Sequence, residues 1–397
     1  MNRRVTVIGG GVIGLATAYA LVREGLAVDL VEARGSLASA TSFANGGQLS
    51  YRYVAPLADA GVPWQALGWL LQGESPLRLR MRLDPAQWRW LAAFVMACRH
   101  TVNRRNAAWL LELALHSQAT LARWREDDGL QGFAWRRNGK LVAFRTARAF
   151  AHGREHLLEP DSQQVLGAAE LQALEPALAD APFIGGVFTP DEEVADCHRF
   201  CQRLAERLQA SGLCRLLLGR PVTGWVRRDD EVLALELGSE QLDVERVVLC
   251  AGYRSPGLAL PGMKLPIYPL KGYSLTAPIT AEHLAPQVSI TDYERKIVYA
   301  RLDQQLRVAA MVDIIGFDES VDARRLRSMH RLAGETLPRA ADYERAVEWA
   351  GMRPATPTGG PIIGGTPYRN VWLNLGHGAL GFTLACGSGE RLARMLG

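Results

Sequence analysis

The sequence predicts an α/β protein in which a parallel, doubly wound sheet is assembled from segments far apart in the chain, with an α+β domain inserted between them. A strand, a helix and a second strand follow one another within about 30 residues at the N-terminus. A buried strand enters a glycine turn at 247–252, and residues 351–397 hold a strand, a glycine loop and a helix. Helical and alternating apolar segments between these predict a cap that contains an antiparallel sheet.

Each expected element rests on a local pattern of apolar, β-branched, glycine and proline residues. In chain order, the expected elements are a strand at 5–8, a helix at 12–24, a strand at 27–31, helical structure from about 60 to 155, a Pro-rich connector at 176–190, a helix at 198–209, a strand at 247–252, alternating strands over 266–315 with a hairpin of 297–302 and 306–311 around Asp303, a strand at 371–375 and a final helix from about Thr383. The domain that contains the parallel sheet should therefore comprise 1–60, 155–265 and 346–397. The cap should comprise 61–154 and 266–345.

Length and composition indicate a large globular protein. At about 150 residues per domain, 397 residues correspond to two or three folding units. Hydrophobic residues make up 48% and charged residues 22%, without low-complexity runs, which excludes disordered, collagen-like and coiled-coil proteins. Six cysteines without a CxxC pair indicate a reducing compartment and give no reason to expect a metal.

The N-terminus has a superficial likeness to a signal peptide, because Arg3 and Arg4 precede an uncharged run over 5–22. Four glycines would weaken an apolar helix there, and cleavage after Ala18 or Ala20 would discard the best motif in the chain. No other stretch approaches the roughly 20 apolar residues of a membrane-spanning helix. We therefore expect a cytoplasmic protein.

A GxGxxG motif follows the first strand. Gly9 permits the tight turn, Gly11 lets a pyrophosphate approach the helix N-terminus, and Gly14 lets the helix pack on the strand. Glu32 ends the second strand, 18 residues after Gly14, where a carboxylate can accept hydrogen bonds from ribose hydroxyls. The pattern predicts a Rossmann-like dinucleotide site without deciding between FAD and NAD, and we expect four neighbouring residues to contact the cofactor: Val12, Ile13, Ala33 and Arg34.

Residues 64–109 combine positive charge with tryptophan. They hold seven Arg against Glu74 and Asp84, a local charge of 7 − 2 = +5, and five of the ten Trp, namely Trp64, Trp69, Trp88, Trp90 and Trp109. One interpretation is an interfacial membrane helix or a partner-docking helix. The other is a helical cap whose Trp residues are core and whose Arg residues are solvated. Nothing accompanies the charge that resembles a nucleic-acid-binding motif.

Five further segments carry a resemblance to a known family: 40–50 (ATSFANGGQLS), 53–56 (YVAP), 269–275 (PLKGYSL), 349–357 (WAGMRPATP) and 374–383 (NLGHGALGFT). Together they resemble FAD-dependent D-amino-acid dehydrogenases, which belong to the D-amino-acid oxidase and glycine oxidase group. The likeness extends over nearly the whole chain. It implies that the cofactor is FAD and that the segment after the second strand wraps its flavin part.

The resemblance also implies which residues contact FAD. In the wrapping segment they are Thr41, Ser42, Asn45, Gly46, Gly47, Gln48 and Leu49. Val222 matches an adenine contact, and Cys250, Ala251 and Gly252 match a second cofactor turn. In the tail, the contacts are Arg353, Gly378, Ala379, Leu380, Gly381 and Thr383, where backbone N–H groups and the start of the last helix would stabilise negative charge on the flavin.

The resemblance implies that Arg353 binds the substrate carboxylate, and a guanidinium is suited to such a bidentate, permanently charged clamp. Tyr53 and Tyr273 could complete the carboxylate site or belong to the core. Lys271 could lie near the flavin or face solvent. His377 could be read as a general base, but a structural role beside the cofactor is expected.

The expected activity is oxidation of a D-amino acid to an imino acid by hydride transfer to flavin N5, followed by hydrolysis to a 2-oxo acid and ammonia. FAD should be noncovalent, since no Cys lies near Arg353. We expect a quinone or carrier as acceptor, with 64–109 as a docking surface on the cytoplasmic face of the inner membrane. Four alternatives stay open: a D-proline or cis-4-hydroxy-D-proline dehydrogenase, a glycine oxidase, a flavoprotein subunit of a larger electron-transfer complex, and, more distantly, a nicotinamide-dependent dehydrogenase.

Overall fold

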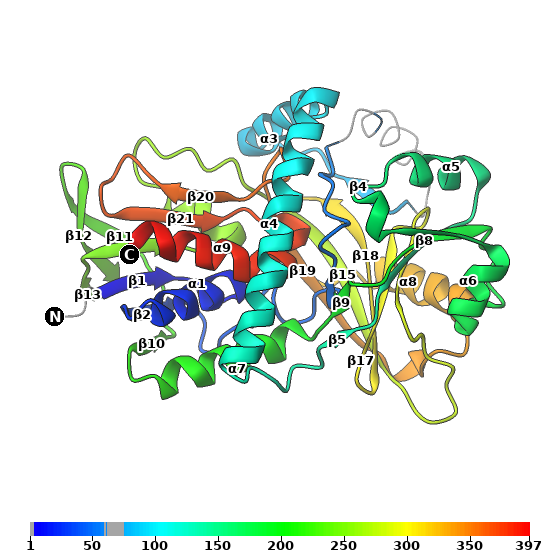
Figure 1. Cartoon of the computed structure of the whole chain (residues 1–397). Coiled ribbons are helices and arrows are strands. Elements are labelled where there is room, and N and C mark those ends of the chain that lie inside the picture. The colour runs from blue at the N-terminus through cyan, green and yellow to red at the C-terminus, as the bar shows by residue number, and fades with distance from the viewer. Residues whose placement is uncertain (1–3, 59–60, 62–74) are drawn as a thin grey trace.

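The computed structural model describes residues 4–58, 61 and 75–397, and it places them around two large sheets (Figure 1). One sheet has six strands and lies with the N-terminal elements. The other has nine strands and occupies the opposite side of the molecule. Two three-stranded sheets complete the strand structure of the described residues. Part of the pattern of tryptophan and charge in 64–109 lies outside the described residues, namely Trp64, Trp69 and Glu74.

The six-stranded sheet is built from three distant parts of the chain. Its order is β10-β2-β1-β14-β21-β20, parallel except for β20. Its strands are β1 (Arg4–Ile8), β2 (Ala27–Glu32), β10 (Cys214–Leu218), β14 (Arg246–Leu249), β20 (Ile362–Gly365) and β21 (Val371–Leu375). This is the discontinuous parallel sheet that the sequence predicts.

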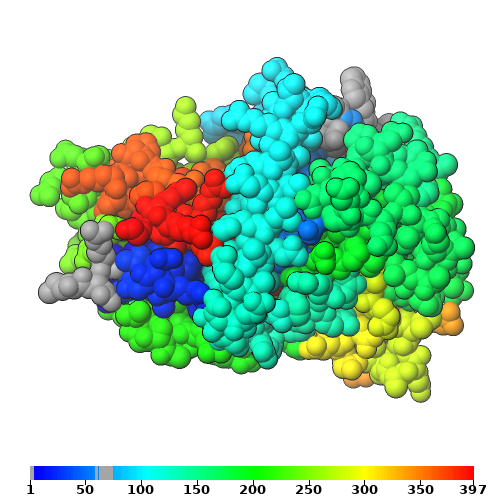
Figure 2. Space-filling model, viewed as in Figure 1, coloured from blue at the N-terminus to red at the C-terminus, as the bar shows by residue number. Residues whose placement is uncertain are grey.

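Four helices belong to the same layer: α1 (Val12–Arg23), α4 (His100–Asp127), α7 (Cys197–Ala210) and α9 (Gly381–Leu396). Their buried side chains, including Leu15, Leu113, Leu204 and Leu384, share one core. Figure 2 shows α4 as a cyan band that runs over the junction between the blue and red elements of this layer and the green elements beside it.

The nine-stranded sheet has the order β19-β15-β18-β17-β16-β6-β8-β7, with β4 paired to β18, and most neighbours are antiparallel. Its strands are β4 (Leu77–Leu79), β6 (Lys140–Phe144), β7 (Gln164–Gly167), β8 (Gly185–Thr189), β15 (Tyr268–Pro278), β16 (Ser289–Asp292), β17 (Ile297–Leu302), β18 (Gln305–Ile314) and β19 (Val347–Ala355). α8 (Ala323–Thr336) packs on it through Leu326 and Met329.

The remaining elements are short or peripheral. The small sheets are β11 (Gly224–Arg228), β12 (Glu231–Leu237) and β13 (Glu240–Asp243), and β3 (Gln48–Leu49), β5 (Arg136–Arg137) and β9 (Glu193–Val194). The other α-helices of the described residues are α3 (Pro85–Ala97), α5 (Ala147–Glu155) and α6 (Ala168–Leu174). The 3-10 segments are η1 (Pro160–Ser162), η2 (Pro176–Leu178), η3 (Gly252–Leu258), η4 (Tyr343–Arg345) and η5 (Gly378–Leu380). In the part of the chain that the structure describes, no helix is both long enough and apolar enough to cross a bilayer.

Most of the expected elements are confirmed. The hairpin forms from β17 and β18, with Asp303 at a φ of 55° in the turn. The expectation of helical structure from 60 to 155 is wrong in part, because β4, β5 and β6 interrupt it. All five residues of β6 are buried, and the apolar run at 141–144 has no period that separates a strand from a buried helix. The Pro-rich connector likewise contains η2 and β8.

The sheets divide the chain differently from the expected domain boundaries. β7 and β8 fall in 155–265 but pair into the nine-stranded sheet. The edge strand β19 falls in 346–397 and also belongs to the nine-stranded sheet. α4 falls in 61–154 but packs on the core of α1 and α9. The cause is that local patterns report an element's type and not its partners, so a strand near a boundary can join either sheet.

Candidate active site

A cavity of about 2570 Å³ lies between the two large sheets. Part of its lining follows the carboxyl ends of the parallel strands β1, β2, β14 and β21, where ligands bind in open α/β sheets. Another part comes from one face of the nine-stranded sheet, including Val142, Gly272 and Val298, and helices α3, α4 and α5 supply further lining residues. The cavity exceeds the usual volume of a small-molecule site and has room for a dinucleotide and a second ligand.

The glycine loop between β1 and α1 forms one end of the cavity. Gly9 has a φ of 111°, and a Cβ there would lie 2.6 Å from the carbonyl oxygen of Cys250. A Cβ on Gly14 would clash with the carbonyl oxygen of Gly9, so only glycine lets α1 pack against the loop. α1 begins at Val12 without a side-chain cap from Gly11, although the Val12 N–H donates to Ser42 Oγ at 3.0 Å. Gly9, Gly11, Val12 and Ile13 line the cavity.

Glu32 ends β2 with its carboxylate fixed by backbone donors. Oε2 accepts from the Gly10 N–H at 2.6 Å, and Oε1 accepts from the Arg34 N–H at 2.8 Å. Glu32, Ala33 and Arg34 all line the cavity. The arrangement holds a negatively charged acceptor at the edge where a ribose would lie.

The segment at 41–49 crosses the nine-stranded sheet and is tied to four of its strands. Thr41 Oγ1 donates to the Met352 carbonyl at 2.6 Å, Ser274 Oγ to the Ala44 carbonyl at 2.7 Å, Arg307 Nη1 to the Asn45 carbonyl at 2.6 Å, and Gln48 Nε2 to the Ile290 carbonyl at 3.0 Å. Thr41, Ser42, Asn45, Gly46, Gly47 and Gln48 line the cavity, whereas Leu49 is buried behind it. Val222, Cys250, Ala251 and Gly252 also line it.

The tail loop brings the start of α9 to the cavity. Gly378, Ala379, Leu380, Gly381 and Thr383 line it, and α9 begins without a side-chain cap, which leaves backbone N–H groups available. His377 is buried, its Nε2 lies 3.1 Å from Ser388 Oγ, and burial lowers its pKa to about 3. An imidazole with such a low pKa is a weak base, so His377 is better suited to a structural role than to proton abstraction.

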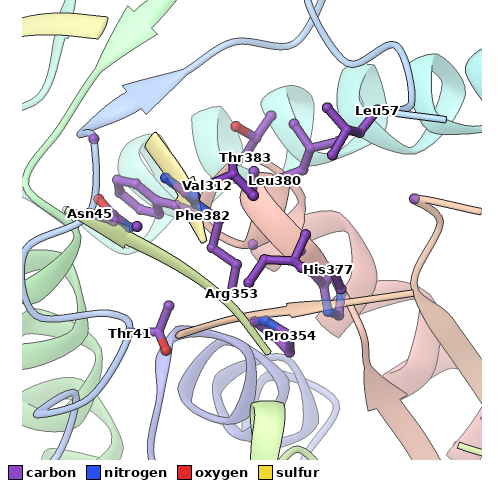
Figure 3. A pocket seen from close by; sticks show the side chains of 18 of the residues that line it. Thr41, Asn45, Leu57, Val312, Arg353, Pro354, His377, Leu380, Phe382 and Thr383 are labelled. Atoms are coloured by element: carbon purple, nitrogen blue, oxygen red, sulfur yellow. The ribbon is translucent and has the colours of Figure 1, made fainter. Parts of the chain in front are cut away.

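Arg353 projects from β19 into the cavity, with Thr41 and Asn45 on one side of it and His377 on the other in Figure 3. Its Nη1 donates to the Met311 carbonyl at 2.8 Å. Gly272 makes room for it, since a Cβ there would overlap the guanidinium. Burial lowers the pKa of Arg353 to about 10, which leaves it cationic at neutral pH. Within the described residues, no carboxylate lies within ion-pair distance of it.

The other expected substrate residues differ in their access to the cavity. Tyr53 lines the cavity and is 41% exposed. Tyr273 borders the cavity, but its hydroxyl donates to Asp313 Oδ2 at 2.9 Å and accepts from Arg78 at 3.3 Å. Lys271 is 1% exposed, lies 3.6 Å from Asp318 and is absent from the lining.

Strand register accounts for the positions of Lys271 and Tyr273. Arg353 is paired with Leu270, and successive residues of a strand point to opposite faces, so the side chains of Lys271 and Tyr273 both leave β15 on the face opposite Arg353. The structure therefore does not bring Lys271 or the Tyr273 hydroxyl together with Arg353.

Sequence reasoning missed two lysines of the cavity. Lys140 Nζ donates to Gln48 Oε1 at 2.9 Å and Ser50 Oγ at 2.8 Å, and burial lowers its pKa to about 8. Lys296 lies in the turn between β16 and β17, and burial lowers its pKa to about 8 as well. Neither residue belongs to a motif, so only the strand register could have revealed them.

Three features of the lining fit a dinucleotide: the glycine loop between β1 and α1, the fixed carboxylate of Glu32, and the backbone N–H groups at the uncapped start of α9. It also leaves His377 Nδ1, a buried nitrogen, without a hydrogen-bond partner at the cavity wall. Over residues 4–58, 61 and 75–397, no group of three or more His, Cys, Asp or Glu side chains could hold a metal ion.

Comparisons with known proteins agree with this architecture. The family model described as DAO, FAD dependent oxidoreductase, matches residues 4–395. The chain is 65% identical over 397 residues to D-amino acid dehydrogenase 2 of Pseudomonas aeruginosa, covering 100% of this chain and 95% of that protein. It is 43% identical over 408 residues to D-amino acid dehydrogenase 2 of Ralstonia nicotianae, covering 99% and 96%.

Solved structures share the fold at low sequence identity. Glycine oxidase from Geobacillus kaustophilus matches with a TM-score of 0.76 and 22% identity, covering 99% of this chain and 95% of that one. L-proline dehydrogenase from P. horikoshii matches with a TM-score of 0.75 and 16% identity, covering 100% and 93%.

Proposed function

The chain belongs to the DAO family of FAD-dependent oxidoreductases, and from that premise we propose that it oxidises D-amino acids to 2-oxo acids and ammonia. The two relatives compared above, which cover nearly the whole chain, are both named D-amino acid dehydrogenases. The observation that carries the proposal is Arg353, a partly buried cation that lines the cavity and has only the Met311 carbonyl as a hydrogen-bond acceptor in the described chain. An anionic group of the substrate would supply the missing partner.

We propose that FAD occupies the length of the cavity. The glycine loop and the start of α1 would hold the pyrophosphate, and Glu32 the adenosine ribose. The segment at 41–48 and the tail loop at 378–383 would enclose the flavin. Bound there, FAD supplies a two-electron acceptor that takes a hydride from the substrate α-carbon. Backbone N–H groups at the start of α9 would stabilise the negative charge that results.

The residues of this chain position the substrate. Arg353 binds its carboxylate and fixes the α-carbon, while the cavity wall limits access of water to the reacting bond. The amino acid loses a hydride and a proton and becomes an imino acid. Water then adds to the C=N bond, and the adduct collapses to a 2-oxo acid and ammonia. No protein base is required for C–H cleavage, which agrees with the neutral, buried His377.

A panel of D- and L-amino acids, with a redox dye as acceptor and purified holoenzyme, tests this proposal. We expect dye reduction with D-amino acids, equimolar 2-oxo acid and ammonia, and no turnover of L-enantiomers. Including D-proline, cis-4-hydroxy-D-proline and glycine tests the narrower alternatives. Failure of every D-amino acid to bleach the flavin would refute the proposal.

We also propose that the acceptor is a quinone or carrier reached at an anionic membrane surface, through α3 and the loop before it. In support, Met81, Leu83, Trp88, Val95 and Met96 are all exposed. Trp88, Val95 and Met96 share one face of α3, at the top of the molecule in Figure 1. Trp90 instead packs in the core and donates to the Ala355 carbonyl at 2.8 Å, so only part of the Trp pattern belongs to the surface.

Flotation with anionic and neutral liposomes tests the docking proposal. Exposed Arg residues beside this surface should each contribute about 1 kcal/mol of attraction to anionic headgroups, which salt would screen. We expect binding to anionic vesicles at low salt and its loss in Leu83→Asp, with Leu218→Asp as an exposed control outside the surface. Equal flotation with neutral vesicles, or rapid peroxide formation in air, would contradict the proposal.

A further inference from the structure

Two lysines and two tyrosines form one end of the cavity, which we call the lysine end: Tyr53, Lys140, Tyr293 and Lys296. Lys140 begins β6, and Tyr293 and Lys296 lie in the turn between β16 and β17. β6 and β16 are paired, with Asp292 opposite Ala143, and the Tyr293 and Phe144 ring centroids lie 4.9 Å apart. Each ammonium lies over a ring, Lys140 at 4.4 Å from the Tyr53 centroid and Lys296 at 3.6 Å from that of Tyr293.

Within the lysine end, Lys296 is the residue that strand register places close to Arg353. The Arg353 guanidinium reaches across β15 to the carbonyl of Met311 in β18. Met311 follows Ala310, whose register partner in β17 is Ile297, the residue after Lys296. Neighbouring strands are about 4.8 Å apart, so the carbonyl that holds Arg353 lies beside the strand end from which Lys296 projects. A short molecule held by Arg353 can therefore reach this lysine.

The carboxylates around Lys296 are committed to other donors. Asp292 accepts from Arg145 Nη2 at 2.7 Å, and Glu294 accepts from the N–H groups of Arg145 and Thr146 at 3.0 Å each. In the described chain neither carboxylate lies within 4 Å of Lys296 Nζ. The cation is thus partly enclosed with an aromatic ring as its main contact.

Lys140 has a similar open donor. Its Nζ gives two of three N–H groups to Gln48 and Ser50, and the nearby Glu192 accepts from the backbone N–H groups of Tyr51 and Arg52. Lys140 is only 3% exposed. In the described chain neither ammonium has a carboxylate within ion-pair distance, although Glu192 attracts Lys140, and Glu294 and Asp292 attract Lys296, over longer distances. Enclosing cations without close ion pairs costs free energy, which an anionic ligand would offset.

Lysine is rare in this chain, so its presence at the cavity wall is informative. Only four lysines occur among its 45 basic residues. Surface charge is supplied by arginine, whereas Lys140 and Lys296 both line the cavity. An ammonium offers a compact cation with rotatable donors, which suits a single carboxylate that varies in position.

We propose that the lysine end binds a carboxylate on the substrate side chain, so that acidic D-amino acids are the preferred substrates. This rests on the proposed function, because Arg353 must hold the α-carboxylate for the side chain to point toward Lys296. Val142, Phe144 and Val187 line the wall beside the lysines and suit the intervening methylene groups. A neutral side chain of the same shape would leave both cations without a partner, and such a mismatch gives strong discrimination.

The test compares D-glutamate with its neutral isostere D-glutamine, each as kcat/KM with a dye acceptor and FAD-loaded enzyme. We expect wild-type enzyme to favour D-glutamate at least tenfold. Lys296→Met should lower the D-glutamate to D-glutamine ratio about tenfold or more, and Lys296→Arg should restore most of it. Lys140→Met should lower it too, and it serves as an independent variant on another strand. Lys264→Met removes an exposed lysine outside the cavity and should leave the ratio unchanged.

Two results would overturn the inference alone: turnover of D-glutamine equal to or faster than that of D-glutamate, or the same ratio in Lys296→Met and Lys264→Met. Activity with neutral D-amino acids in those cases would leave the proposed function standing. Absence of flavin bleaching by any D-amino acid, with FAD bound, would overturn the proposed function and this inference together.

Discussion

Replacing Arg353 by leucine is the sharpest test of the site, because the side chain has one protein acceptor and no ion-pair partner in the described structure. Leucine keeps much of the apolar stem and removes the guanidinium. Truncating one member of a buried charge pair costs about 2–5 kcal/mol. At 1.4 kcal/mol per tenfold change, we expect kcat/KM to fall by about 30- to 4000-fold.

The assay is anaerobic rapid mixing, with flavin absorbance followed after addition of a D-amino acid. Arg353→Lys keeps the charge without the bidentate fork and should fall between wild type and leucine. The FAD spectrum and the Tm of each variant serve as controls for folding, since loss of the Arg353 to Met311 hydrogen bond alone should cost about 1.5–3 kcal/mol. Normal flavin reduction in Arg353→Leu would refute the assignment and require another carboxylate anchor.

Gly272 offers a second route to the same conclusion without removing charge. A methyl group on Gly272 would occupy the position of the Arg353 guanidinium. We expect Gly272→Ala to displace Arg353 and reduce kcat/KM, whereas Gly334→Ala, whose methyl group meets nothing within 4 Å, should not. Equal activity of the two variants would show that the position of Arg353 does not matter.

Three further outcomes follow from the site. Glu32→Ala should weaken FAD binding by about 1.5–3 kcal/mol for each charge-assisted hydrogen bond lost. Ultrafiltration measures the FAD retained, with Glu24→Ala as an exposed-residue control, and unchanged retention in Glu32→Ala would contradict the role of Glu32 at the ribose. Acid precipitation should leave the flavin in the supernatant, since 352–358 contain no Cys, and a yellow pellet would show a covalent bond. Lys296 is cationic below its pKa of about 8 and neutral above it, so the D-glutamate to D-glutamine ratio should fall between pH 7 and pH 9; a ratio independent of pH would contradict the role of Lys296.

The parallel sheet was predictable because its signals are local. The Gly9 to Gly14 spacing and Glu32 report a tight turn, a close helix and a strand end, all of which are set by backbone geometry within about 30 residues. The hairpin around Asp303 was predictable for the same reason. The packing of α4 was not, because its partner α9 lies near the other end of the chain. The place of β7 and β8 was not predictable either, because they join the sheet through β6, which lies within the segment expected to be helical.

The substrate side of the cavity shows where local reasoning stops. Tyr273 and Lys271 share a motif with Gly272, yet alternation along β15 directs both side chains to the face opposite Arg353, while the absence of a side chain at Gly272 leaves space for the guanidinium. Lys296 belongs to no motif, but the pairing of β17 with β18 places it next to the carbonyl that holds Arg353. Register, and not residue type, therefore selects which cations meet at the site. For that reason variants at Lys271 should change stability without altering the preference between D-glutamate and D-glutamine, whereas variants at Lys296 should alter that preference.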